Sequence, residues 1–177
     1  AASLNTISSY SKDLNQFIIS VPRLSNNIFE YAVRDDLKNY LVDFDVNNCF
    51  GVTLTLKQGI KNQKLDDISC SQNLKHFLNV LNQKVFGNQV KRFGKRLRVL
   101  PVLEMSKGRR LHYHLTLENP FPREPNRFSN LIETEWNKTK FSHSHIHIHQ
   151  HINWEWNDYI TKFNNSNDQI DWMNYKN

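Results

Sequence analysis

Cysteines are scarce in this sequence and no long apolar run occurs, and each absence excludes a class of protein. Two cysteines among 177 residues are too few for a disulfide framework, so Cys49 and Cys70 are expected to be free thiols in a reducing compartment. No apolar run approaches the length that crosses a bilayer, and the first residues show no signal-peptide core. We therefore expect a soluble, cytoplasmic protein without a membrane partner.

The length and the charge suggest one domain with a polyanionic partner. A chain of 177 residues with 38% hydrophobic content can bury one core of ordinary size. We predict a single domain over residues 1–177, with residues 1–23 as an N-terminal arm. The net charge of +6 favours a polyanion without identifying it.

Hydrophobic periodicity predicts helices and strands in alternation. Apolar residues at helical spacing predict helices over residues 25–43, 66–86, 126–138 and 154–163, and Gly87 should end the second helix. Alternating patterns predict strands over residues 49–57, 98–105, 111–117 and 143–151. The first strand should turn Phe50 and Val52 to one face and Thr53 and Thr55 to the other.

The two middle strands should form a hairpin that carries a metal site. Alternate residues of a strand share a face, so His112 and His114 should point the same way, about 6.5 Å apart. A tight turn over residues 106–110 would bring Glu104 beside them. Two imidazole nitrogens and one carboxylate leave coordination positions open, as catalytic metal sites require. A His-x-His pair by itself is more often polar surface than a metal site, but the acid upstream, the basic turn and a tyrosine further on favour the metal.

Basic residues surround this hairpin in the sequence. Between positions 91 and 110 the only acid is Glu104. A run of charge is often just a solvated face, but here it flanks the predicted metal, which favours a phosphate backbone as the partner. The residues predicted to bind DNA are Lys57, Lys91, Arg92, Lys95, Arg96, Arg98, Lys107, Arg109 and Arg110.

A second histidine-rich stretch spans residues 143–151. Its five histidines occupy odd positions, so a strand places them on one face and Ile146, Ile148 and Ile152 on the other. The isoleucines should pack on helices. The histidine face could bind a second metal, contact DNA, or form only the polar side of a sheet.

Tyr159 and Lys162 are three residues apart and should be neighbours on the last helix. A tyrosine on a helix is more often packed than reactive, and only about one in a thousand free tyrosines is ionised at pH 7. An adjacent ammonium group and a metal-bound phosphate would both favour the phenolate.

In these motifs the chain resembles the HUH endonucleases, and most closely the rolling-circle replication initiator (Rep) proteins of plasmids and small phages. The strand Thr53–Lys57, Glu104 before His112 and His114, and Tyr159 before Lys162 occur in the family's order. By this resemblance the fold should be α+β, with a central antiparallel sheet of about five strands, an interior strand carrying the histidines, and the tyrosine helix beside it.

The resemblance also assigns roles to individual residues. Glu104, His112 and His114 would hold a divalent ion, Mn²⁺ or Mg²⁺ with zinc as an alternative, Tyr159 would be the nucleophile, and Lys162 would orient or neutralise the phosphate. The chain departs from the family where some initiators have a second tyrosine. It also lacks the G-x-x-x-x-G-K-[ST] phosphate loop of a fused helicase.

The expected function is nicking and joining of single-stranded DNA at a replication origin, for example at a DNA hairpin, together with a host helicase. A 5′-phosphotyrosine and a free 3′-OH would result. The alternatives are a single-strand transposase or relaxase of the same superfamily, a non-catalytic nucleic-acid-binding module, and a histidine-rich metal-binding protein.

Overall fold

The structure is a computed structural model that describes residues 46–162 and 169–176. These residues belong to Val42–Asn177, one of two units into which the chain divides. The predicted helix over residues 25–43 and the predicted arm over residues 1–23 lie outside the described residues, so the single-domain hypothesis stays a prediction. Within the described part, no helix is both long enough and apolar enough to span a membrane.

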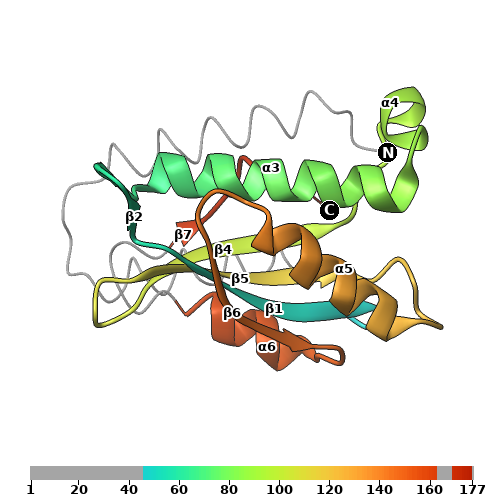
Figure 1. The fold of residues 1–177 in the computed structure, drawn as a ribbon. Coiled ribbons are helices and arrows are strands. Elements are labelled where there is room, and N and C mark those ends of the chain that lie inside the picture. The colour runs from blue at the N-terminus through green and yellow to red at the C-terminus, as the bar shows by residue number, and fades with distance from the viewer. Residues whose placement is uncertain (1–45, 163–168, 177) are drawn as a thin grey trace, which may run out of the picture. The chain divides into compact units, whose positions relative to one another are not determined.

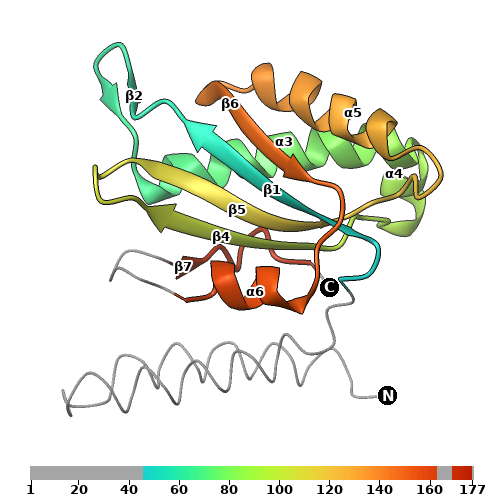
Figure 2. The ribbon, with the colours of Figure 1, turned by 90° about the horizontal axis from the view of Figure 1, so that it is seen from below.

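Five strands form an antiparallel sheet in the order β6–β1–β5–β4–β7 (Figures 1 and 2). They are β1 (Cys49–Leu56), β4 (Val99–Met105), β5 (Leu111–Glu118), β6 (Ser142–His149) and β7 (Gln169–Ile170). The strand β5, which carries both predicted histidine ligands, lies in the interior between β1 and β4. The predicted α+β fold, the five-stranded antiparallel sheet and the interior position of this strand are confirmed.

Side-chain alternation gives the sheet an apolar face and a polar face. On β1, Phe50, Val52 and Leu54 are at most 1% exposed, whereas Thr53 and Thr55 are only partly buried. A strand buried on one side has this period of two. We call the face with Phe50 and Val52 the core face and the face with Thr53 and Thr55 the site face.

Helices α3 (Asp67–Phe86) and α5 (Pro125–Asn137) cover the core face (Figures 1 and 2). The Asp66 side chain starts α3 by accepting a hydrogen bond from the Ser69 N–H at 2.7 Å, which satisfies one of the unpaired donors of a helix end. This bond holds the pKa of Asp66 below its ordinary value. Gly87 ends the helix with φ at +54°, a conformation that favours glycine. The predicted helix over residues 66–86 is therefore confirmed.

Aromatic side chains join the two helices over the core. Phe77 of α3 meets Trp136 of α5 edge to face, with ring centroids 5.4 Å apart. Phe128 of α5 packs against Phe50 of β1 at 5.5 Å. All four side chains are buried. Aromatic pairs in this geometry add to the stabilisation from burial, by about 0.5–1.5 kcal/mol each.

Helix α6 (Trp154–Ile160) lies across the site face, on the other side of the sheet from α3 (Figure 2). Its N-cap is Asn153, whose side-chain oxygen accepts a hydrogen bond from the Glu155 N–H at 3.1 Å. The helix predicted over residues 154–163 therefore exists but ends earlier, and Lys162 lies beyond its last residue.

Several short elements were not predicted. These are the two-stranded pair β2 (Gly59–Ile60) and β3 (Gln63–Lys64), helix α4 (Gln89–Phe93), and β7. A strand of two residues shows no periodicity in the sequence, and β7 is defined by its pairing with Val102 and Leu103 of β4.

The histidine-rich strand was predicted correctly except at its end. Ile146 and Ile148 of β6 pack against the core, as expected. The strand stops at His149, so His151 is no longer part of the alternation. The prediction that Ile152 shares the face of the other isoleucines is wrong, because its side chain reaches over Gly51 on the site face.

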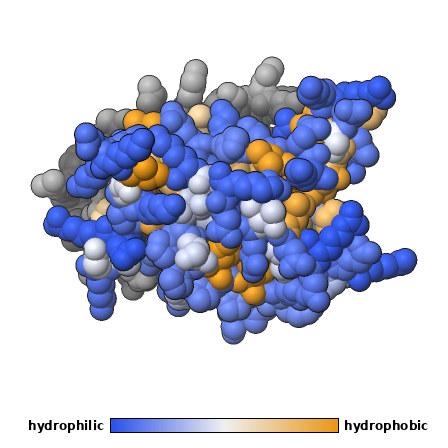
Figure 3. All heavy atoms as spheres, in the orientation of Figure 1, coloured by the Kyte–Doolittle hydropathy of each residue, from blue (hydrophilic) through white to orange (hydrophobic). Residues whose placement is uncertain are grey.

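Hydrophobic residues reach the surface in small, separated patches on the side seen in Figure 3, and hydrophilic side chains cover most of this side. The largest apolar side chains of the described residues that are exposed include Phe93 of α4 and Trp154 of α6.

Candidate metal centre

The hairpin of β4 and β5 places three potential ligands on the site face. Glu104 is the direct cross-strand partner of His112, and Val102 is the partner of His114. Direct cross-strand partners have Cβ atoms about 4.5–5.5 Å apart on the same face. The register of the hairpin therefore brings the carboxylate beside both imidazoles, as the sequence predicted.

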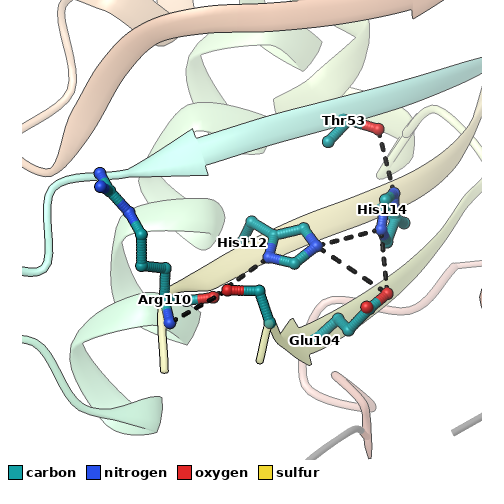
Figure 4. A network of polar contacts seen from close by, with 6 residues as sticks. Thr53, Glu104, Arg110, His112 and His114 are labelled. Atoms are coloured by element: carbon teal, nitrogen blue, oxygen red, sulfur yellow. Dashed lines mark hydrogen bonds and ion pairs between the residues drawn. The ribbon is translucent and has the colours of Figure 1, made fainter. Parts of the chain in front are cut away.

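The ligand atoms of these three residues converge (Figure 4). The Nε2 atoms of His112 and His114 lie 3.2 Å apart. Glu104 Oε2 lies 3.0 Å from Nε2 of His114 and 3.8 Å from Nε2 of His112. One ligand atom from each residue falls within 4.8 Å of the others, so the group could hold a metal ion.

The other nitrogen of each imidazole already has an oxygen partner. Nδ1 of His112 lies 3.2 Å from the Arg110 carbonyl oxygen, which can only accept, so this nitrogen carries the proton. Nδ1 of His114 lies 3.0 Å from the Thr53 hydroxyl. Such partners fix ring orientation and leave the opposite nitrogen as a metal ligand. The residues therefore fit a divalent ion, with both Nε2 atoms and one carboxylate oxygen as ligands.

The site is buried at one side and open at the other. His114 is 7% exposed, whereas Glu104 and His112 are only partly buried. Three protein ligands of mixed nitrogen and oxygen character do not complete the coordination of a divalent ion, so positions remain for water or substrate.

Helix α6 brings Tyr159 to this centre. The Tyr159 ring lies edge to face with the His114 ring, with centroids 6.0 Å apart, and the side chain is 53% exposed. Trp156, one turn earlier on the helix, contacts the same imidazole at 6.0 Å. The predicted nucleophile therefore lies beside a predicted metal ligand.

The docking of α6 depends on a glycine in β1. A Cβ atom at Gly51 would lie 2.8 Å from Cε2 of Trp156 and 2.8 Å from Cγ2 of Ile152, too close for real contacts. The Thr116 hydroxyl of β5 donates a hydrogen bond to the side-chain oxygen of Asn157 on α6. The missing side chain at Gly51 thus makes room for the helix that carries Tyr159.

Tyr113, between the two histidines in sequence, points to the core face. It is fully buried, and its hydroxyl donates to Asp171 Oδ2 at 2.9 Å. Burial, and next the nearby Asp171 carboxylate, raise the pKa of Tyr113 above its ordinary value. Tyr113 is therefore a core residue and does not face the metal ligands.

Eight of the nine predicted DNA-binding residues fall into two groups at opposite ends of β4 (Figure 2). Lys107, Arg109 and Arg110 are exposed in the turn that follows Met105, next to the metal ligands. Lys91, Arg92, Lys95, Arg96 and Arg98 precede Val99, and a seven-residue strand separates them from the turn by roughly 20 Å. The basic run therefore does not surround the centre as one patch.

Several cations of the second group contact the protein itself. Arg96 donates to the carbonyl oxygens of Val90 and Lys95. Arg98 lies 4.0 Å from the Glu118 carboxylate. Lys57, the remaining predicted residue, is exposed just after β1, and its N–H donates to Phe141 beside the start of β6.

Sequence reasoning missed several residues that shape the centre. Thr53 lies in a strand that resembles a family motif, but its contact with His114 was not foreseen. Gly51 and Trp156 were not singled out either. The alternation of β1 could have placed Gly51 and Thr53 on one face, but the helix above them depends on tertiary packing.

Comparisons with protein-family models, curated proteins and solved structures find no match for this chain. The function is therefore inferred from the site itself.

Proposed function

We propose that the protein is a metal-dependent endonuclease that nicks and rejoins single-stranded DNA through a covalent tyrosine intermediate. The main support is that the ligand atoms of Glu104, His112 and His114 converge. In addition, the ring centroid of Tyr159 lies 6.0 Å from that of His114. This combination supplies an ion site for a phosphate and a nucleophile for phosphorus. The resemblance to replication initiators supports the same conclusion.

Glu104, His112 and His114 would hold the ion through one carboxylate oxygen and two Nε2 atoms. Mg²⁺ and Mn²⁺ are preferred because the ion must bind a phosphate oxygen and release it again, and the two imidazoles favour manganese. The bound ion would act as a Lewis acid that polarises the scissile phosphate.

Tyr159 is proposed as the nucleophile. Its hydroxyl oxygen would form a bond to phosphorus while the bond from phosphorus to the 3′ oxygen breaks. The phenol gives up its proton, and the departing 3′ oxygen takes one up. The products are a 5′-phosphotyrosine and a strand with a free 3′-OH, and the reverse step joins the ends.

The cations near the centre would position the substrate. Lys107, Arg109 and Arg110 are exposed beside His112 and would contact phosphates close to the scissile one. Lys162, exposed beyond α6, would neutralise charge at the attacked phosphate. In a cell, the 3′-OH would prime rolling-circle replication at an origin, with a host helicase separating the strands.

The test is covalent capture. The protein is incubated with Mn²⁺ and a library of single-stranded oligonucleotides, and the adduct is mapped by mass spectrometry. We expect the 5′-phosphate on Tyr159, and Tyr159→Phe should fold and bind metal but form no adduct. Tyr113→Phe is the control, because its hydroxyl lies on the core face and should not be needed for the chemistry.

Other outcomes would identify the alternatives. An adduct on another residue, or one that persists in Tyr159→Phe, contradicts the proposed nucleophile. Binding of DNA without any adduct, and without sensitivity to chelators, indicates a non-catalytic nucleic-acid-binding module. Transfer between two palindromic ends would favour a transposase of the same chemistry.

A further inference from the structure

The site face continues past the metal centre onto the edge strand β6. Thr53 of β1 is the register partner of His114 on β5 and of His147 on β6. Gly51 is in the same way the partner of His149. Register partners lie on the same face of a sheet. His147 and His149 therefore stand on the face that carries the predicted metal ligands. The register shifts between Leu54 and Leu56, and there the Thr55 hydroxyl holds the backbone of His145 by bonding to its carbonyl oxygen.

Small side chains of β1 lie between the predicted ligands on β5 and the β6 histidines that precede His149. Adjacent strands lie about 4.8 Å apart, so β6 is about 10 Å from β5, and the residues between them are Thr53 and Thr55. The Thr55 hydroxyl bonds to the carbonyl oxygen of His145 and stays close to the sheet. The β1 side chains between His114 and β6 are therefore short and polar.

Helix α6 covers one end of this surface and leaves the other open. The Trp156 ring lies 5.4 Å from the ring of His149. At the other end, His145 and His147 are exposed and His143 is partly exposed. The rings of His143 and His145 stack 4.9 Å apart with an interplanar angle of 20°. The open end thus presents flat aromatic rings.

The charge at this end is favourable for an anion. No Asp or Glu occurs between residues 136 and 154 of the sequence. Lys57 and Lys140 are both exposed, and their chain segments meet where the Lys57 N–H donates to the Phe141 carbonyl oxygen at 2.8 Å. Imidazole rings stack on nucleobases and donate to phosphate oxygens, which suits single-stranded DNA.

We propose that His143, His145 and His147 form a contact surface for the DNA strand beside the scissile phosphate. The identity of the ligand as single-stranded DNA rests on the proposed function. A strand bound at the metal centre is blocked on one side by α6, so it continues across Thr53 and Thr55 to the open end of β6. The surface contributes to affinity and takes no part in the chemical step.

The test compares two double variants that each remove two exposed histidines. His145→Ala with His147→Ala removes rings of the proposed surface. His76→Ala with His151→Ala removes one histidine from α3 and one from beyond β6. Affinity for a fluorescein-labelled oligothymidylate is measured by anisotropy, and Mn²⁺ affinity and thermal unfolding are measured on the same samples. We expect the first pair to weaken DNA binding about tenfold with unchanged Mn²⁺ affinity, and the control pair to bind like the wild type.

The outcomes separate this inference from the proposed function. If both double variants bind the oligonucleotide equally well, the β6 histidines are only polar surface and the inference is wrong, even if Tyr159 still forms its adduct. If His145→Ala with His147→Ala weakens DNA binding but no adduct is ever found, the DNA contact surface is supported and the proposed chemistry is wrong. A loss of Mn²⁺ affinity in the first pair would overturn the inference, because the histidines would then act through the metal centre.

Discussion

Thr53 and His114 are neighbours across β1 and β5, and the Thr53 hydroxyl lies 3.0 Å from Nδ1 of the imidazole. The opposite nitrogen of the same ring lies 3.0 Å from Glu104. Contacts at both ring nitrogens thus fix the orientation of the His114 imidazole. A residue on a strand next to the ligand strand therefore sets how a proposed metal ligand is oriented.

Replacing this hydroxyl should weaken metal binding without removing a ligand. Thr53→Val keeps the shape of the side chain but leaves Nδ1 of His114 without its partner, so Mn²⁺ affinity should fall about 10–100-fold. Thr55→Val is the matched control, since the Thr55 hydroxyl bonds to the His145 carbonyl oxygen instead. Calorimetric titration of both variants checks this, and equal affinities would show that the Thr53 contact does not support the centre.

Metal binding should stabilise the fold, and the effect should depend on the three ligands. An ion at about one hundred times its dissociation constant adds about 2.7 kcal/mol to the free energy of unfolding when it binds only the folded state. His112→Ala and His114→Ala should lose most of this gain, while His76→Ala on α3 should keep it. Thermal unfolding with and without Mn²⁺ provides the measurement, and retention of the full gain in either ligand variant would refute the assignment.

A methyl group at Gly51 should separate metal binding from catalysis. In Gly51→Ala the new Cβ would lie 2.8 Å from Trp156, so α6 must shift and carry Tyr159 away from its position. Misplacement of about 1 Å can cost about a hundredfold in rate, so adduct formation should slow by about that factor while Mn²⁺ affinity holds. Gly108→Ala in the hairpin turn is the control, because its nearest atom would be 4.0 Å away. Equal rates for the two variants would contradict the role of Gly51.

The two groups of basic residues should differ in the salt dependence of DNA binding. Each phosphate contact with a single strand contributes about 0.7 to the slope of log affinity against log salt. Alanine at Lys107, Arg109 and Arg110 should flatten the slope by up to about 2. Alanine at Lys91, Arg92 and Lys95 should change it less when the oligonucleotide is short. A larger effect of the second triple variant would place the DNA at the other end of the sheet.

Alkaline pH should destabilise the protein partly through Cys70. Burial, and next the charge of Asp67, raise the pKa of this thiol from 9.0 to about 12. A raised folded-state pKa stabilises the fold below the unfolded-state value, and this stabilisation is lost as pH rises from about 9 towards 12. Denaturant unfolding across this window should show a shallower decline for Cys70→Ala than for the wild type. Parallel declines would show that the thiol does not contribute.

The parts of the fold that follow one-sided burial could be predicted from the sequence. The alternation in β1 separated Thr53 from Phe50 and Val52, and the alternation in β5 turned His112 and His114 the same way, because a strand packed on one side must repeat every two residues. The hairpin register then followed from a short turn. These two features account for the predicted metal centre.

The features that could not be predicted depend on distances between residues in the folded chain, which sequence order does not give. The basic residues looked continuous around Glu104, but β4 holds Arg98 and Lys107 at opposite ends. Ile152 fits the alternating isoleucine pattern in the sequence, but β6 ends at His149 and the Ile152 side chain lies over Gly51. The pairing of β7 with β4 involves only two residues of each strand, so tertiary contacts and not local pattern determine it.

The interior position of β5 and the short length of α6 imply different lifetimes for their backbone amides. The strand β5 is hydrogen-bonded to neighbours on both sides, so its amides should exchange with solvent deuterium only when the whole sheet opens. Helix α6 has seven residues and rests on the sheet from outside, so its amides should exchange through local opening at a much lower free energy. During such an opening Tyr159, with any DNA strand attached to it, would leave the site face while the ligand group stays assembled on the sheet.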